Sequence, residues 1–382
     1  MQKSIRSRFY LPFAGAALGV SLLVQGPRLP GWTLGAAGLL AAPVPMLQTA
    51  AALWAAPEPS PVPAPVPAPT AAPPAAALPV PPQAAGPAAA EQPPAVEAAL
   101  PAGPALSLPE GEPPAGAGAV KTKTFRQAAG GVFVACGPAT IRNNTKTTGQ
   151  DRIQAAVAAG LPFAVTPHSP DPQVLILHTH ATECYLTHTG PWYAPGDTGR
   201  STDTDIGVCA VGQVMTDVLN RAGISTLHDT TLHDYPSYNA AYDNSRKTAQ
   251  AYLAKYPSIR VVIDVHRDAI ESDGVRIAPA AEIGGRRAAQ VMLISGADNG
   301  GSVKLPHCME NLAFAAAWQT AMESAYPGLT RPVLYSHRFY NQDLSTGALL
   351  LEVGSHGTSL DQALYAGELA ARALAAALTG QL

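Results

Sequence analysis

The sequence predicts an α/β fold for residues 173–382, a three-layer sandwich in which helices cover both faces of a mostly parallel sheet. The first observation is that short apolar runs, such as 174–177 and 348–351, lack the polar alternation of a half-exposed strand. The second is that amphipathic segments with helical spacing, such as 208–222, separate these runs. Buried strands that alternate with helices are typical of this fold class.

Each predicted element is bounded by signals in the sequence. Gly160 and Gly223 follow two helical segments, and glycine commonly ends a helix. Ser359 to Gln362 form a capping box, in which serine and glutamine satisfy free N–H groups at the start of the last helix. The predicted helices span 150–160, 208–223, 242–256, 310–328 and 360–378, and the predicted strands span 130–137, 174–178, 260–266, 288–296 and 348–355.

Residues 1–56 are expected to form a cytoplasmic tip and a membrane anchor. Three basic residues precede an uncharged apolar stretch at 9–26, which is close to the minimum length of a spanning helix. A second apolar stretch at 31–56 is interrupted by prolines. The positive-inside rule leaves the N-terminus in the cytoplasm, so a single pass through the cell membrane puts the C-terminal domain outside the cytoplasm. A hairpin of two spans and a cleaved signal peptide are the alternatives.

The middle of the chain is expected to be a spacer. Residues 57–118 are mostly proline and alanine, which cannot bury a core, so a disordered, extended linker is predicted there. Residues 119–172 are interpreted as a transitional segment with one short strand and one short helix. The folded domain with the chemistry is then expected at 173–382.

Composition excludes several classes of function. The formal net charge of −3 gives no basic field for nucleic acid. The four cysteines contain no CxxC pair, which argues against a cysteine-rich zinc site and against a disulfide framework, although one bridge stays open.

Polar side chains follow three of the predicted strands. The first strand of the domain ends on His178 and is followed by His180 and Glu183, a later strand ends on His266, and the last carries Glu352 after its apolar run. In parallel α/β sheets ligands bind beyond the carboxyl ends of the strands, so these side chains are expected at one edge. Imidazoles and carboxylates are ligands that suit Zn²⁺. The three strand ends together therefore predict a catalytic metal site.

Each of these residues also has a structural interpretation. One of His178 and His180 is expected to be a hydrogen-bonded structural histidine, and His266 alone fits a buried core position. Glu352 is the hardest to explain by packing, because a carboxylate after three leucines is costly to bury unless it is paired. The other histidines are interpreted as solvent-facing: His168, His188, His228, His233, His307, His337 and His356.

Three ordered blocks resemble the stage II sporulation protein P family. They are "VLILHTHATECY", "YDNSRKTAQAYLAKYPSIRVVIDVHRDA" and "YNQDLSTGALLLEVGS", and the resemblance covers residues 173–378. It implies a zinc amidase-like domain that hydrolyses N-acetylmuramoyl-L-alanine bonds in peptidoglycan, and also peptide cross-links. It further implies action with sporulation proteins D and M at the septal and forespore membrane during engulfment.

The resemblance to zinc amidases also implies roles for three residues. It places His180, rather than His178, and His266 at the positions of zinc-binding histidines, and Glu352 at the position of the general base. The family's pattern for the third ligand is not matched, and Glu183 is assigned to that role because it is the nearest glutamate.

Two further assignments do not follow from motifs that this chain shares with the family. The family's third ligand is a glutamate before the first long helix, where this chain has Asp203 and Asp205, so these two remain alternatives to Glu183. Arg267 is assigned to bind acidic stem-peptide carboxylates on its charge alone.

The predicted function is zinc-dependent hydrolysis of the N-acetylmuramoyl-L-alanine bond. A zinc carboxypeptidase or endopeptidase that cuts stem peptides is one alternative. A non-catalytic wall-binding module is another, and Glu352 argues against it because binding alone needs no base.

Overall fold

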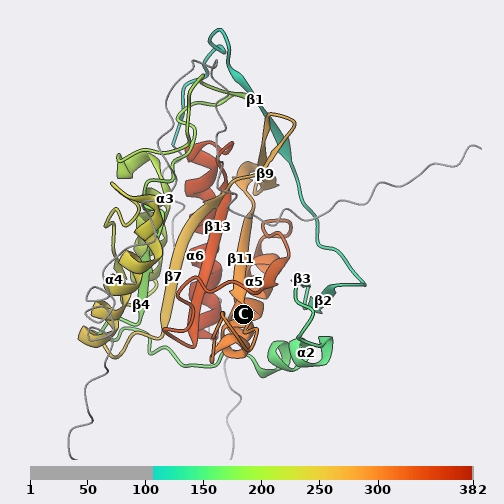
Figure 1. The fold of residues 1–382 in the computed structure, drawn as a ribbon, viewed down its shortest axis with the longest axis vertical. Helices are drawn as coiled ribbons and strands as arrows, with labels where there is room; N and C mark the ends of the chain where they lie inside the picture. Colours follow the sequence, from blue (N-terminus) through green and yellow to red (C-terminus); the bar gives the residue numbers. More distant parts are fainter. Residues whose placement is uncertain (1–105, 381–382) are drawn as a thin grey trace, which may run out of the picture. The chain divides into compact units, whose positions relative to one another are not determined.

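The computed structural model describes residues 106–380 and contains an eight-stranded sheet. Five of its seven neighbouring strand pairs are parallel, so the mostly parallel sheet is confirmed. Figure 1 shows the central strands side by side. In order across the sheet the strands are β2 (Phe133–Cys136), β3 (Ala139–Asn143), β12 (Val333–Ser336), β11 (Val291–Gly296), β13 (Gly347–Ser355), β7 (Val261–Asp268), β4 (Val174–Leu177) and β6 (Thr226–His228).

Helices cover both faces of this sheet, as predicted. They are α2 (Gln150–Ala159), α3 (Val208–Arg221), α4 (Ala241–Lys255), α5 (Cys308–Ala325) and α6 (Leu360–Thr379). Val261, Ile263 and Val265 of β7 belong to the large core that includes α2, α3, α5 and α6. Val262 faces the other way and shares a smaller core with Ala249 of α4. The period of two along β7 thus separates the two faces, and α4 lies on the face that will carry the site.

A second sheet holds strands that the sequence pattern did not predict. Its order is β10 (Arg286–Ala289), β9 (Val275–Ile283), β1 (Gly118–Lys123) and β5 (Trp192–Tyr193), with β8 (Glu271–Ser272) paired to β9. The single strand predicted at 288–296 is wrong, because β10 and β11 lie in different sheets. Gln290 separates them; its buried amide accepts the N–H of Phe125 and donates to the carbonyls of Phe125 and Gly328.

The expected transitional segment belongs to the two sheets. β1 pairs with β9, β3 pairs with β12, and α2 packs into the main core. The end of the expected linker also makes contacts, since Leu108 packs on the core and the indole of Trp192 donates to Gly111 O at 3.0 Å. The remainder of that linker and the membrane anchor predicted at 1–56 lie outside the described residues.

Two smaller expectations concern the last helix and the cysteines. α6 begins after Ser359 as predicted, but the Ser359 side chain makes no capping hydrogen bond, so the reciprocal capping box is not formed. The four cysteines are free and buried, which leaves no disulfide bond among them. Within residues 106–380, no helix combines the length and the hydrophobicity that crossing a membrane requires.

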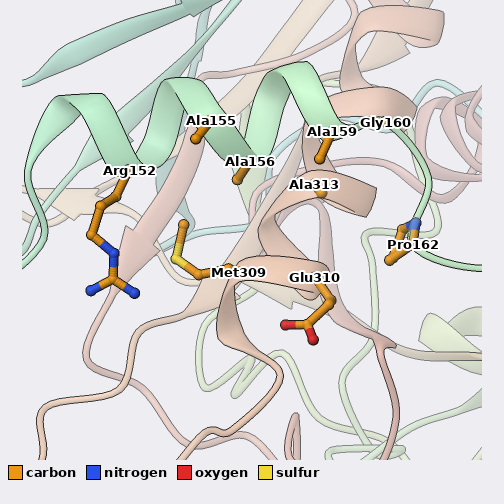
Figure 2. Close-up of a pocket in the computed structure, with 9 residues that line it drawn as sticks. All are labelled: Arg152, Ala155, Ala156, Ala159, Gly160, Pro162, Met309, Glu310 and Ala313. Carbon is orange, nitrogen blue, oxygen red and sulfur yellow. The ribbon is translucent and has the colours of Figure 1, made fainter.

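A hollow of about 340 Å³ lies between α2 and α5 (Figure 2). Alanines from both helices contribute to its lining, and Arg152 and Glu310 are its two charged residues. None of the polar residues predicted to act chemically lines it. We therefore interpret it as a gap in helix packing and look for the chemistry at the strand ends.

Candidate functional site

The ends of β4, β7 and β13 bring the predicted site residues together. β4 stops at Leu177, and the chain then turns through His180 and Glu183. β7 and β13 are parallel neighbours, and Glu352 is the direct register partner of His266. Residues in register on adjacent strands point to the same face of a sheet. The sheet therefore places Glu352 beside His266, as the sequence pattern predicted.

His180, Glu183 and His266 form the centre of the site. Oε2 of Glu183 lies 3.5 Å from Nδ1 of His266. The rings of His180 and His266 are nearly perpendicular, with centroids 5.4 Å apart. All three side chains are buried. Aromatic rings line one side of this centre. The ring of Tyr238 stacks on the ring of His180 with the two centroids 4.5 Å apart, and Tyr242 meets the same histidine ring edge-on.

Glu183 and His266 carry opposite charges. Burial raises the pKa of Glu183. The hydrogen bond to His266 and the charge of His266, followed by the charges of Arg267 and Arg200, outweigh burial, so the pKa lies below its usual value. Burial lowers the pKa of His266, yet the neighbouring charge of Asp264 and then Glu183 hold it well above its usual value. Without a bound cation the two side chains thus form a buried ion pair.

Glu352 has the surroundings of a proton-transfer group. Burial, followed by the nearby charge of Asp268, raises the pKa of Glu352 to about 8, against the lowering effect of His266. Its Oε2 atom is buried and has no hydrogen-bond partner. Gly354, two residues on, has φ +62° at an irregularity in the β13–β7 pairing, a conformation that glycine adopts without strain. A half-buried carboxylate with one buried, unbonded oxygen, toward the carboxyl end of β13, is a candidate general base.

The donor set fits zinc in its chemistry. Two imidazoles and one carboxylate are a known ligand set for catalytic zinc, and His180, Glu183 and His266 supply this set within one buried cluster. As the side chains are placed, no group of three His, Cys, Asp or Glu residues within 106–380 is close enough to share an ion. The three side chains would have to turn toward a common point to hold a metal ion.

His178 occupies a different environment from His180. Its Nδ1 donates to the carbonyl of Val265 at 2.9 Å, and its Nε2 lies 2.9 Å from Nε2 of His228. Gly212 of α3 packs against both rings, and a Cβ there would lie 2.6 Å from the His178 ring. With both ring nitrogens engaged and no exposed surface, His178 has the contacts of a structural histidine. His228 and His233 were predicted to face solvent, but they bond to His178 and His233 is buried.

The burial of His178 predicts an acid-sensitive contribution to stability. Burial, and then the charge of His228, lower the pKa of His178 from 6.5 to about 3. Between these values the unfolded chain binds a proton that the folded chain does not. Lowering the pH below 6.5 therefore decreases the free energy of unfolding, by at most about 1.4 kcal/mol per pH unit. We expect His178→Gln to flatten this slope in urea unfolding between about pH 6.5 and 5, and an unchanged slope would contradict it.

Arg267, which was expected to bind substrate, is held in place by backbone carbonyls. Arg267 is 5% exposed, and its guanidinium donates to the carbonyls of Cys184 and Gly199. The predicted contact with a substrate carboxylate remains a prediction that these bonds do not favour. Arg200, which the sequence reasoning missed, keeps 30% of its side chain exposed beside Glu183.

The alternatives for the third ligand lie in a turn. Asp203 accepts the N–H of Asp205 and caps the short helix η2 (Thr204–Ile206), and both aspartates are exposed. Neither of them makes a hydrogen bond or an ion pair with His180 or His266, whereas Oε2 of Glu183 lies 3.5 Å from Nδ1 of His266. Two buried aspartates beside the histidines were also missed. Asp264 precedes His266 by two residues and could have been found from strand periodicity, whereas Asp234 is on a loop and gave no signal.

The fold and the site define an α/β protein with a buried histidine and carboxylate centre at the carboxyl edge of its sheet. The family model described as stage II sporulation protein P matches residues 138–375, and the chain belongs to that family.

The chain is 31% identical over 209 residues to the stage II sporulation protein P of Bacillus subtilis (strain 168). The match covers 52% of this chain and 49% of that protein, so the chain spans about half the length of the curated relative it matches.

Two solved structures are more distantly similar. The CwlD amidase of Clostridioides difficile, solved in complex with the GerS lipoprotein, is 12% identical with a TM-score of 0.35, over 55% of this chain and 98% of that one. The catalytic domain of CwlV, an N-acetylmuramoyl-L-alanine amidase of Bacillus (Paenibacillus) polymyxa var. colistinus, is 14% identical with a TM-score of 0.30, over 52% and 95%. Both TM-scores are too low to transfer an activity to this chain.

Proposed function

We propose that the chain is a zinc-dependent peptidoglycan hydrolase that cuts the N-acetylmuramoyl-L-alanine amide bond during sporulation. The observation that carries the proposal is the meeting of His180, Glu183 and His266 beside an unpaired carboxylate, Glu352. Membership of the stage II sporulation protein P family supports the sporulation setting. A membrane-anchored, extracytoplasmic location, with sporulation proteins D and M as partners, belongs to the same proposal.

His180, Glu183 and His266 would hold the zinc ion. The chemistry supplied by bound zinc is a lowered pKa for water and polarisation of the amide carbonyl. Glu352 accepts a proton from the attacking water and passes it to the leaving amine nitrogen, so that the stem peptide departs with a free L-alanine N-terminus.

Digestion of purified peptidoglycan tests this reaction. We expect the zinc-loaded chain to release intact stem peptides with an N-terminal L-alanine, and a chelator to stop the release. Mass spectrometry of the soluble fragments separates the outcomes. Shortened stem peptides would instead indicate a carboxypeptidase or an endopeptidase. Binding to peptidoglycan without any released fragment would indicate a wall-binding module.

A further inference from the structure

Asp264 is a buried aspartate held by one threonine and placed against one histidine. Thr179 donates its backbone N–H to Oδ1 of Asp264 at 2.7 Å and its hydroxyl to Oδ2 at 2.6 Å. The same Oδ1 lies 2.9 Å from Nε2 of His266. Asp264 and His266 are two residues apart on β7, so both point to the same face of the sheet.

Asp234 repeats this arrangement at the other histidine. Thr182 donates its backbone N–H to Oδ1 of Asp234 at 3.2 Å and its hydroxyl to Oδ2 at 2.6 Å. That Oδ2 lies 3.6 Å from Nδ1 of His180 and also accepts Nη1 of Arg200 at 2.8 Å. Both aspartates are 6% exposed. Each candidate histidine ligand therefore has its own threonine-held carboxylate.

The ring nitrogens that face the aspartates are those left without an aligned partner. Nδ1 of His180 and Nε2 of His266 are buried and make no complete hydrogen bond. By contrast, both ring nitrogens of His233 have partners, at the carbonyl of His178 and at the Thr248 hydroxyl. A buried ring N–H that lacks a bond but lies near an aspartate can complete that bond by a small rotation.

We propose that Asp264 and Asp234 are positioning residues, each of which accepts the N–H of one histidine and leaves the opposite ring nitrogen to the metal ion. This inference rests on the proposed function. The tautomer of a histidine is fixed by the bond its other nitrogen makes, and a carboxylate behind a metal-bound histidine raises its affinity. His266 then binds through Nδ1, the atom that faces Glu183, and His180 binds through Nε2.

The same inference gives a role to Thr179 and Thr182 in the "HTHATE" segment. Both side chains are buried, and a bidentate threonine leaves a carboxylate little freedom to turn away from its histidine. Glu323 provides a matched comparison outside the site. It is also 6% exposed and accepts the N–H and the hydroxyl of one threonine, Thr330, at 2.6 and 2.7 Å, but it makes no hydrogen bond or ion pair with a histidine.

Zinc affinity of the full chain tests the proposal without reference to activity. We expect Asp264→Asn and Asp234→Asn each to weaken binding of Zn²⁺ by about 10- to 100-fold, measured in competition with a chromophoric chelator. The visible spectrum of the Co²⁺-loaded chain should change in both variants. Glu323→Gln should bind Zn²⁺ as tightly as the wild type, although it loses a similar buried bond.

A pair of variants at Thr179 covers the case in which an asparagine variant fails to fold. Thr179→Ser keeps the hydroxyl and should retain the wild-type affinity for Zn²⁺, whereas Thr179→Val keeps the shape and should lose affinity. Wild-type affinity in both folded asparagine variants, or in Thr179→Val, overturns the positioning roles alone. A wild-type chain that binds no Zn²⁺, or His266→Ala that binds it fully, overturns the proposed metal site and this inference with it.

Discussion

Glu352→Gln is expected to cut peptidoglycan at least about 100-fold more slowly than the wild type, because loss of a general base typically costs about 10²- to 10⁴-fold in rate. Glutamine keeps the size of the side chain but cannot accept a proton from water. Glu352 stands in register with His266, and no group bonds its buried Oε2, so little in the fold depends on its charge. The variant should therefore fold, bind peptidoglycan and retain zinc.

Initial rates of fragment release, the zinc content and the melting temperature should be measured on the same preparation of Glu352→Gln. A rate near that of the wild type would make Glu352 a structural carboxylate and require another base. Loss of zinc with the rate would make Glu352 a ligand in place of Glu183. Asp343→Asn is a suitable control, because Asp343 pairs with Arg246 at 2.6 Å and does not bond to any of the candidate ligands.

His180→Ala and His266→Ala should each lose most of the bound zinc. Each removes one of three protein ligands, and two remaining ligands hold zinc poorly. His178→Ala should retain more zinc, since the ring of His178 is engaged by Val265 and His228 rather than by the centre. Zinc per chain, determined by atomic emission after dialysis, gives the comparison. Equal loss in all three variants would contradict the choice of His180 over His178.

The main sheet could be predicted because its central strands are apolar runs. β4, β7 and β13 are buried on both faces, and such strands carry their signal in every residue. β9 was missed because Pro279 and several alanines give it no clear period. β10 and β11 were merged because the one residue between them, Gln290, is not a turn residue, and the change of sheet depends on its distant partners in Phe125 and Gly328.

The candidate site could be predicted in part for the same reason. Parallel strands share one carboxyl edge, so Glu352 and His266 could be placed together from the sequence. Asp234 could not, because a loop residue reaches His180 only through the path of the chain between β6 and α4. Nor could the burial of Arg267 be predicted, since its partners are backbone carbonyls that the sequence does not specify.

Anomalous diffraction at the zinc edge from crystals of the zinc-loaded chain tests the central claim most directly. We predict one peak, about 2.0–2.2 Å from a ring nitrogen of His180, from a ring nitrogen of His266 and from a carboxylate oxygen of Glu183. The carboxylate of Glu352 should lie close to this peak without being bound to it. No peak at the strand ends, or a peak bound by His178, Asp203 or Asp205, would contradict the site proposed for this chain.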